Sequence, residues 1–146
     1  MKKFVFTLQS LYGVTLSTEK QQKLQLKKTE ARLVWLEEGL EKMKSEYLEY
    51  KVRCAKEMEE GISADELSQY NIYFDCLFNL MVEQKDHILR TEAERDRCRA
   101  ALVKTRRKVQ TLEKVKESQY EAYLQEIKIE QEKDMGDLVA YRAAAR

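Results

Sequence analysis

The sequence predicts an all-α fold, a long antiparallel two-helix coiled coil whose C-terminal helix overhangs the first helix. Three observations support this fold. The 146 residues include no proline and only four glycines, while 36% of them are charged, which is typical of long solvated helices. Apolar residues recur at heptad spacing along two stretches, and one strong turn signal separates these stretches. We therefore expect one coiled-coil domain over residues 1–146.

The turn signal lies between Gly61 and Glu66. A glycine suits the C-terminus of a helix because it adopts the left-handed backbone conformation at no steric cost. Ser63 followed by Glu66 predicts a capping box, in which the serine hydroxyl accepts a hydrogen bond from the Glu66 amide and the Glu66 side chain accepts one from the Ser63 amide. We expect the first helix over about 4–60, the turn over 61–63 and the second helix over about 64–140.

Heptad rows accompany both expected helices. The rows of the first helix are Leu26, Leu33, Leu40, Tyr47, Cys54 and Leu36, Met43, Tyr50, and those of the second begin with Leu67, Phe74, Met81, Ile88 and Tyr70, Leu77. A short turn makes the two helices antiparallel neighbours, so residues whose numbers add up to about 124 should face one another. Residues after about 120 should then overhang without a partner.

Several core positions far from the turn are polar: Thr15, Glu19, Gln22 and Thr29 in the first helix and Thr91, Arg95 and Thr105 in the second. We expect looser packing and greater mobility there than near the turn, where the core rows are apolar.

Charge is distributed unevenly along the chain. Residues 2–28 hold six basic and one acidic residue, residues 90–116 hold ten basic and four acidic residues, and residues 30–89 carry a net charge of −7. The antiparallel pairing brings the two basic segments together. We therefore expect a basic open end, an acidic turn end, and an acidic partner for the open end.

The sequence offers little for catalysis. His87 is the single histidine, and neither a glycine-rich phosphate loop nor a hydrolase or metalloprotease motif occurs. Cys54, Cys76 and Cys98 have the spacing of neither a disulfide framework nor a zinc site, so we expect mostly buried thiols. A two-helix coil also lacks a water-excluding pocket. We expect no enzyme activity, no cofactor, no metal and no small-molecule substrate.

Other binding functions have weak support. The basic run Lys104–Lys108 lacks aromatic side chains on which bases could stack, so we expect no nucleic-acid binding. No apolar run reaches the roughly 18 residues of a membrane span, and the apolar stretch after Lys3 is too short for a signal peptide. We expect a cytoplasmic protein.

Aromatic residues gather on both sides of the turn. They are Tyr47, Tyr50, Tyr70, Tyr73, Phe74 and Phe78. They can form either an exposed protein-binding surface or an enlarged local core, and the sequence leaves both alternatives open.

Motifs along the whole chain resemble the flagellar export protein family FliJ. The opening block has Phe4, Phe6 and Leu8 in the family's F-x-F-x-L spacing, and a Gly-Ile turn precedes Tyr70-x-x-Tyr73-x-x-x-Leu77. The basic block 106–116 and the later stretch 130–134 also resemble the family. One departure is the C-terminal Asp-Glu of the family, which appears here as residues 134–137 with the sequence Asp-Met-Gly-Asp.

This resemblance implies a non-enzymatic component of the flagellar export apparatus, similar to the gamma subunit of rotary ATPases. It implies a central stalk that binds the hexameric export ATPase, promotes its assembly and activity, and couples it to the export gate protein FlhA. It also implies assistance to export chaperones and a location on the cytoplasmic face of the inner membrane.

The resemblance also implies site residues. The gate-docking positions carried over from the family are Met43, Tyr50, Tyr73, Leu77 and Leu80. Where the family has a histidine, the match is Gln84 or, with a shift of the register, His87. For the ATPase ring, the charge distribution suggests that Lys104, Arg106, Arg107 and Lys108 meet acidic groups. Two alternatives stay open, the equivalent stalk of a virulence-type secretion system and a scaffolding coiled coil joined through Tyr120, Tyr123, Leu124, Ile127 and Leu138.

Overall fold

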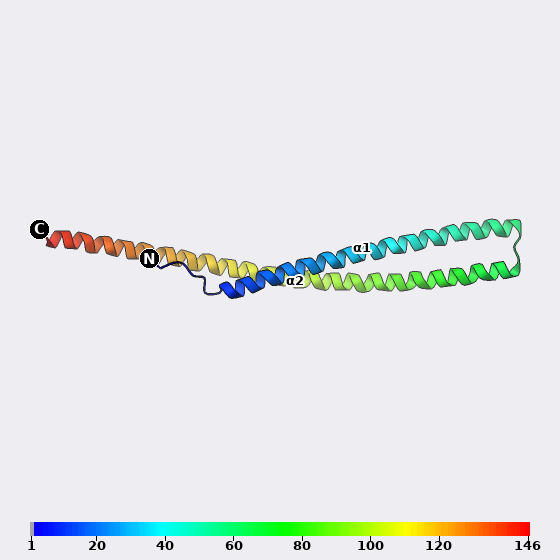
Figure 1. Ribbon diagram of the computed structural model, residues 1–146, viewed down its shortest axis with the longest axis horizontal. Coiled ribbons are helices and arrows are strands. Elements are labelled where there is room, and N and C mark those ends of the chain that lie inside the picture. The colour runs from blue at the N-terminus through cyan, green and yellow to red at the C-terminus, as the bar shows by residue number, and fades with distance from the viewer. Residues whose placement is uncertain (1) are drawn as a thin grey trace. The chain divides into compact units, whose positions relative to one another are not determined.

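The computed structural model describes residues 2–146, which form two helices and no β-strand. Helix α1 spans Gln9–Glu60 and helix α2 spans Ala64–Ala144 (Figure 1). The helices pack against each other in antiparallel orientation, which confirms the predicted all-α hairpin. The chain forms two compact units, a hairpin unit of residues 22–101 and a terminal unit of residues 1–21 and 102–146.

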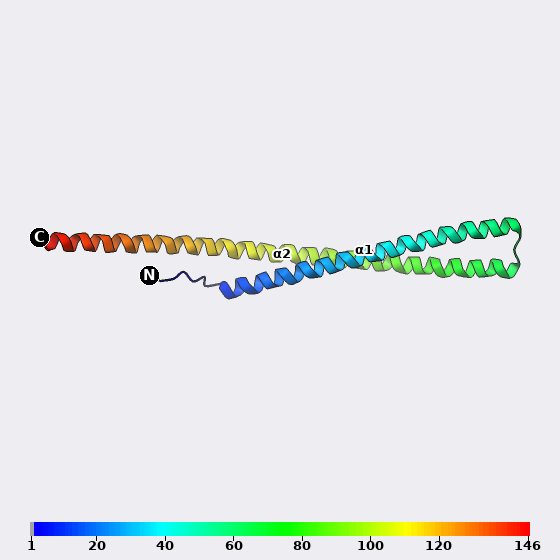
Figure 2. The same cartoon turned by 45° about the horizontal axis from the view of Figure 1, so that its top comes forward.

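The turn between the helices has one of the two predicted hydrogen bonds of the capping box, the one from the Glu66 amide. Gly61 adopts a φ of 92°, in the left-handed region where a side chain would be strained. The Ser63 hydroxyl accepts a 3.2 Å hydrogen bond from the Glu66 amide, and the Ser63 carbonyl accepts one of 3.1 Å from the Leu67 amide. Ser63 is thus the N-cap of α2, and the chain reverses within three residues (Figure 2).

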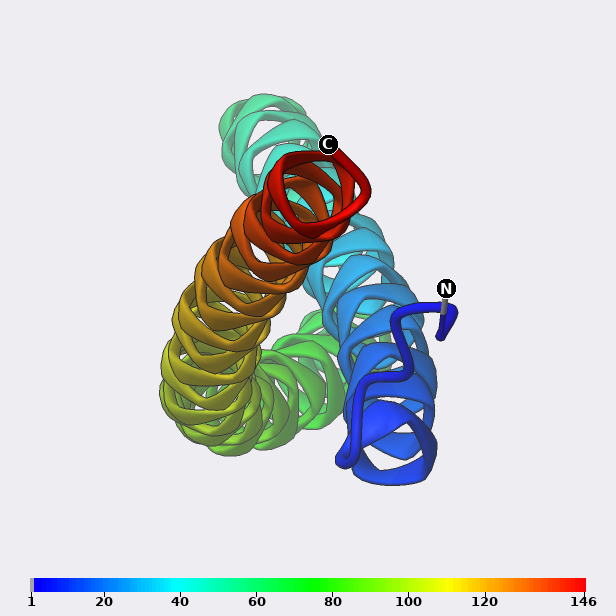
Figure 3. The same ribbon diagram turned by 90° about the vertical axis from the view of Figure 1, so that its left-hand side faces the viewer.

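Helix α1 begins later than the predicted residue 4 or so. Its first residue is Gln9, and the preceding segment has the non-helical course seen as the dark blue trace in Figure 3. This segment is drawn to α2 by its aromatic side chains. The Phe4 ring lies 5.2 Å from the Tyr120 ring and 5.5 Å from the Tyr123 ring, and Phe6 is buried. A helical Phe4–Leu8 segment could not place both phenylalanines in this way, because residues i and i+2 do not share a helix face.

The hairpin unit has an apolar core. Its buried side chains are Leu33, Leu36, Leu40, Cys54 and Leu77. Two ion pairs join the helices, Arg32–Glu94 at 2.6 Å and Glu30–Arg99 at 3.1 Å. The residue numbers of both pairs add up to slightly more than the predicted value of about 124, so the predicted antiparallel register is confirmed.

The terminal unit has a smaller core and a longer overlap than predicted. Its buried apolar side chains are Phe6, Leu102, Val109 and Leu112. The Tyr123 hydroxyl donates a 2.5 Å hydrogen bond to the Lys2 carbonyl, and Thr7 and Gln119 are hydrogen-bonded at 3.2 Å. Partners on α2 therefore reach Tyr123, past the predicted limit of about 120. Beyond Ile127 every residue of α2 is exposed.

The predicted polar core positions differ in burial: the four threonines are buried, whereas Glu19, Gln22 and Arg95 are half-buried. Thr29 is the most buried residue of the described chain, with 1% of its surface exposed, and Thr15, Thr91 and Thr105 are also buried. The hydroxyls of Thr15, Thr29 and Thr91 donate to the carbonyls four residues earlier at 2.7, 3.0 and 2.8 Å. These buried hydroxyls are satisfied, so they carry no desolvation penalty. Greater mobility at these positions stays a prediction.

Two further observations concern the burial of the cysteines and the length of the apolar segments. Cys54 is buried and Cys98 half-buried, but Cys76 is exposed, so the prediction of buried thiols is wrong for Cys76. Cys76 lies on α2 next to the buried Leu77 and therefore faces away from the core. In the described part of the chain, neither helix holds an apolar segment able to cross a bilayer.

Candidate protein-interaction surfaces

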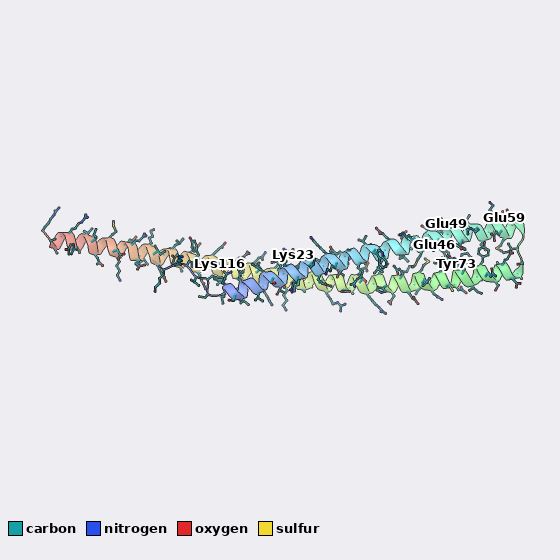
Figure 4. The ribbon with its side chains drawn as sticks, in the orientation of Figure 1. Lys23, Glu46, Glu49, Glu59, Tyr73 and Lys116 are labelled. Atoms are coloured by element: carbon teal, nitrogen blue, oxygen red, sulfur yellow. The ribbon has the colours of Figure 1, made fainter. Side chains whose placement is uncertain are left out.

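The aromatic residues beside the turn form a groove in the hairpin unit. The rings of Tyr50 on α1 and Tyr73 on α2 are stacked, with centroids 4.0 Å apart and an interplanar angle of 24°. We call the surrounding depression, of about 350 Å³, the tyrosine groove; its lining residues are Tyr50, Arg53, Glu57, Glu66, Gln69, Tyr70 and Tyr73. Figure 4 shows Tyr73 on α2 and Glu46 on α1 at neighbouring levels.

Carboxylates lie beside the tyrosine hydroxyls of this groove. The Tyr70 hydroxyl donates a 2.6 Å hydrogen bond to Glu57, and this bond, with desolvation, raises the pKa of Tyr70 to about 12. Burial and then the neighbouring Tyr50 and Glu46 raise the pKa of Tyr73. Glu57 and Glu46 are thus the acidic neighbours of these two phenols.

The sequence left open whether the aromatic residues beside the turn form an enlarged local core or an exposed surface, and the structure shows both. Tyr47, Tyr50, Tyr70, Tyr73 and Phe74 are half-buried, and their rings contact one another across the helices. They enlarge the local core. Phe78, in contrast, has 59% of its surface exposed.

The predicted gate-docking residues fall into two groups. Met43, Tyr50 and Tyr73 are half-buried and Leu80 is 50% exposed, so a partner could reach them. Leu77 is a core residue with 5% of its surface exposed, and a direct contact with a partner is not open to its side chain. Leu77 is therefore part of the hairpin core and not of the accessible surface.

Gln84, the remaining predicted gate residue, makes a contact between the two helices. Its amide nitrogen donates a 2.9 Å hydrogen bond to the backbone carbonyl of Leu36. A Cβ atom at Gly39 would lie 3.1 Å from the same nitrogen. Gly39 therefore leaves the space in which Gln84 crosses to α1. This contact could have been predicted from the sequence, because the expected register places Gly39 of the first helix opposite Gln84 of the second.

The predicted ATPase-binding residues are all exposed, but they occupy two flanks of α2. Lys104, Arg107 and Lys108 line a depression of about 430 Å³ in the terminal unit, which we call the basic groove; its other lining residues are Leu11, Thr15, Thr111 and Leu112. Arg106 lies outside this groove, with its Nε 3.8 Å from Glu19. The basic groove therefore combines three cations with an apolar floor.

Sequence reasoning missed the aromatic cluster of the terminal unit. Besides the contacts of Phe4, the Phe6 and Tyr12 rings lie 6.3 Å apart, and the Lys116 ammonium lies 5.9 and 5.5 Å from their centroids. A signal existed in the sequence. Tyr120 and Tyr123 fall opposite the F-x-F block when residue numbers are paired to about 124.

Charged side chains line both grooves, beside leucines and threonines in the basic groove and beside tyrosines in the tyrosine groove. Among residues 2–146, histidine, cysteine and carboxylate side chains nowhere gather in a group of three that could hold a metal.

The comparison with protein families gives one result. The model of the family described as "Flagellar FliJ protein" matches residues 4–146, essentially the whole chain. We found no match among curated proteins and none among solved structures. The family match agrees with the hairpin fold and with the order of the motifs along the chain. The chain therefore belongs to the flagellar FliJ family, whose members are non-catalytic components of the flagellar export apparatus.

Proposed function

We propose that this protein is the central stalk of the flagellar export ATPase and couples the ATPase ring to the export gate. The supporting observation is that each compact unit carries its own docking groove, and the two grooves have opposite chemistry. One groove is basic and the other is aromatic and acidic. A connector between two different partners needs two such surfaces.

The basic groove is our proposed contact with the ATPase hexamer. Lys104, Arg107 and Lys108 present three cations around the exposed edge of Leu11. Acidic side chains of the ring would pair with these cations, and an apolar neighbour would cover Leu11. Arg106 contributes from the other flank, where it is partly held by Glu19.

The tyrosine groove is our proposed contact with the export gate protein FlhA. The accessible residues Met43, Tyr50, Tyr73 and Leu80 form the contact, while Leu77 and Gln84 hold these residues in place. In this proposal the protein also assists export chaperones and lies at the cytoplasmic face of the inner membrane.

A scaffolding function has less support. Its proposed joining surface includes Tyr120 and Tyr123, and both rings already contact Phe4 of the same chain. For the virulence-type alternative, the matching family model describes a flagellar protein. We therefore favour the flagellar stalk.

Charge reversal in the basic groove tests the proposal. The variant Lys104→Glu/Arg107→Glu/Lys108→Glu should abolish stimulation of the export ATPase, because each new carboxylate would repel the acidic ring. The measurements are hexamer formation and the rate of ATP hydrolysis with the purified full-length protein. Lys128→Glu/Lys133→Glu/Arg142→Glu is the matched control, because it makes the same charge change on exposed residues of α2 outside the groove. Unchanged stimulation by the groove variant would refute the assignment.

A further inference from the structure

We propose that the tyrosine groove recognises a basic amphipathic segment of its partner, with an arginine or lysine placed against Tyr50 and Tyr73. This inference rests on the proposed docking of the export gate, and it specifies the chemistry of the segment that docks. It also assigns roles to Glu46 and Glu57, which lie outside the residues carried over from the family.

The field at the groove favours a cation. Two carboxylates, Glu57 and Glu66, and one cation, Arg53, line the groove, and the Glu46 carboxylate contributes to the raised pKa of Tyr73. Within residues 2–146, neither Glu46 nor Glu66 forms an ion pair, so both carboxylates are open to an incoming charge. The first 21 residues of α2, 64–84, contain four acidic residues and neither lysine nor arginine.

The groove already binds one guanidinium of its own chain. The Arg53 guanidinium lies 5.2 Å from the centroid of the Tyr50 ring, within the range of a cation–π contact. The aromatic face is therefore positioned for a planar cation. Tyr73 stacks on the same Tyr50 ring, and Glu46 lies on α1 at a neighbouring level (Figure 4).

Apolar side chains continue from the groove along both helices. Leu80 is seven residues after Tyr73 and Met43 is seven residues before Tyr50, so each lies on the same helix face as the tyrosine. Leu80 is 50% exposed and Met43 is half-buried. A partner helix that carries apolar residues at heptad spacing and one or two flanking cations would match this arrangement.

A second copy of the hairpin unit fits the groove poorly. Residues 30–89 carry a net charge of −7, so two such surfaces would repel each other. The basic segment 90–116 of another copy is complementary in sign, and its binding is a distinct outcome that the experiment below detects.

Binding of two matched peptides tests the inference. Both are amphipathic helices with leucines at heptad spacing; the first has flanking arginines and the second has glutamines in their place. With the full-length protein and fluorescence anisotropy, the arginine peptide should bind about tenfold more tightly at low salt, and added salt should reduce the difference. Equal affinity of the two peptides would overturn the inference. Sedimentation shows whether a second copy of the chain occupies the groove. Dimers that form with rising concentration of the wild type and are absent from the Glu46→Gln/Glu57→Gln variant would identify a second copy as the occupant. That result would overturn the proposed partner.

Charge-neutralising variants locate the site. Glu46→Gln/Glu57→Gln should weaken binding of the arginine peptide about three- to tenfold, because two carboxylates of the site are replaced by neutral amides of the same size. Glu37→Gln/Glu38→Gln is the matched control, with the same charge change on exposed residues of α1 outside the groove. An equal effect of both variants would mean non-specific attraction and would overturn the site.

Binding of purified FlhA separates this inference from the proposed function. If FlhA binds the wild type and the Glu46→Gln/Glu57→Gln variant equally, the inference fails while gate docking stands. If FlhA does not bind the wild type but the arginine peptide binds through Glu46 and Glu57, gate docking fails while the chemistry of the groove stands.

Discussion

The hairpin unit and the terminal unit share a heptad repeat but differ in the side chains of their cores and in the charge of their surfaces. In the hairpin unit, leucines and aromatic rings fill the core, and the surface is acidic. In the terminal unit, a non-helical segment with Phe4 and Phe6 covers α2, and the surface carries clustered cations. The comparison shows that a repeat fixes which residues face the partner helix, while the residues beside the core determine what the outside can bind.

The core difference predicts unequal effects of the same substitution. Leu36→Ala should lower the free energy of unfolding by about 2–5 kcal/mol, because the leucine is 4% exposed and its loss leaves a cavity. Leu112→Ala, in the smaller core of the terminal unit, should lower the free energy of unfolding by less, because the surrounding side chains can relax into the space that the leucine leaves. Urea denaturation measures both values.

Leu124→Ala serves as the control for this comparison. Leu124 has 46% of its surface exposed, so its truncation should change the free energy of unfolding by less than about 0.5 kcal/mol. Equal losses for Leu36→Ala and Leu112→Ala would show that the two cores contribute alike, and the comparison would lose its energetic basis.

The fold could be predicted from the sequence because its signals are local and repetitive. The heptad rows, Gly61 and Ser63 specify two helices, a turn and a register without knowledge of the rest of the chain. The start of α1 could not be predicted in this way, because it depends on where Phe4 and Phe6 find partners more than a hundred residues later.

The candidate sites were predicted less completely than the fold. Residue type and spacing identified Lys104, Arg107 and Lys108 as a group, but only the side-chain packing separates them from Arg106. The heptad rows include Leu77 and leave Leu80 out, which agrees with the burial of Leu77 and the exposure of Leu80. The resemblance to the family placed both leucines in one docking surface, because a resemblance of motifs carries no information on which side chains are buried.

The contact between Gly39 and Gln84 predicts a sign change in a double-mutant cycle. Gly39→Ala alone should be neutral or slightly destabilising, since the gain in helix propensity of about 1 kcal/mol is offset by displacement of the Gln84 amide. In the Gln84→Ala background the same change should stabilise by about 1 kcal/mol. Thermal unfolding of the four proteins gives a coupling energy of about 1 kcal/mol or more. Additive effects would mean that Gln84 does not depend on the space at Gly39.

The smallest expected effect concerns the phenol of Tyr70 at alkaline pH. The hydrogen bond to Glu57 raises the pKa of Tyr70 to about 12, above its ordinary value of 10.0. The folded state therefore holds the proton more tightly than the unfolded state. Its stabilising contribution is complete below pH 10 or so and is lost as the pH rises through about 12. The free energy of unfolding of Tyr70→Phe should accordingly fall less steeply than that of the wild type over this range.

Denaturation at a series of alkaline pH values measures this difference, and Tyr141→Phe provides the control. Tyr141 has 76% of its surface exposed, so its removal should leave the slope unchanged. The three proteins differ only at the substituted tyrosine, and comparison at each pH therefore isolates the phenol. If Tyr70→Phe and the wild type lose stability in parallel, Tyr70 does not donate to Glu57 in solution, and Glu57 is then open to the partner's cation without competition from the phenol.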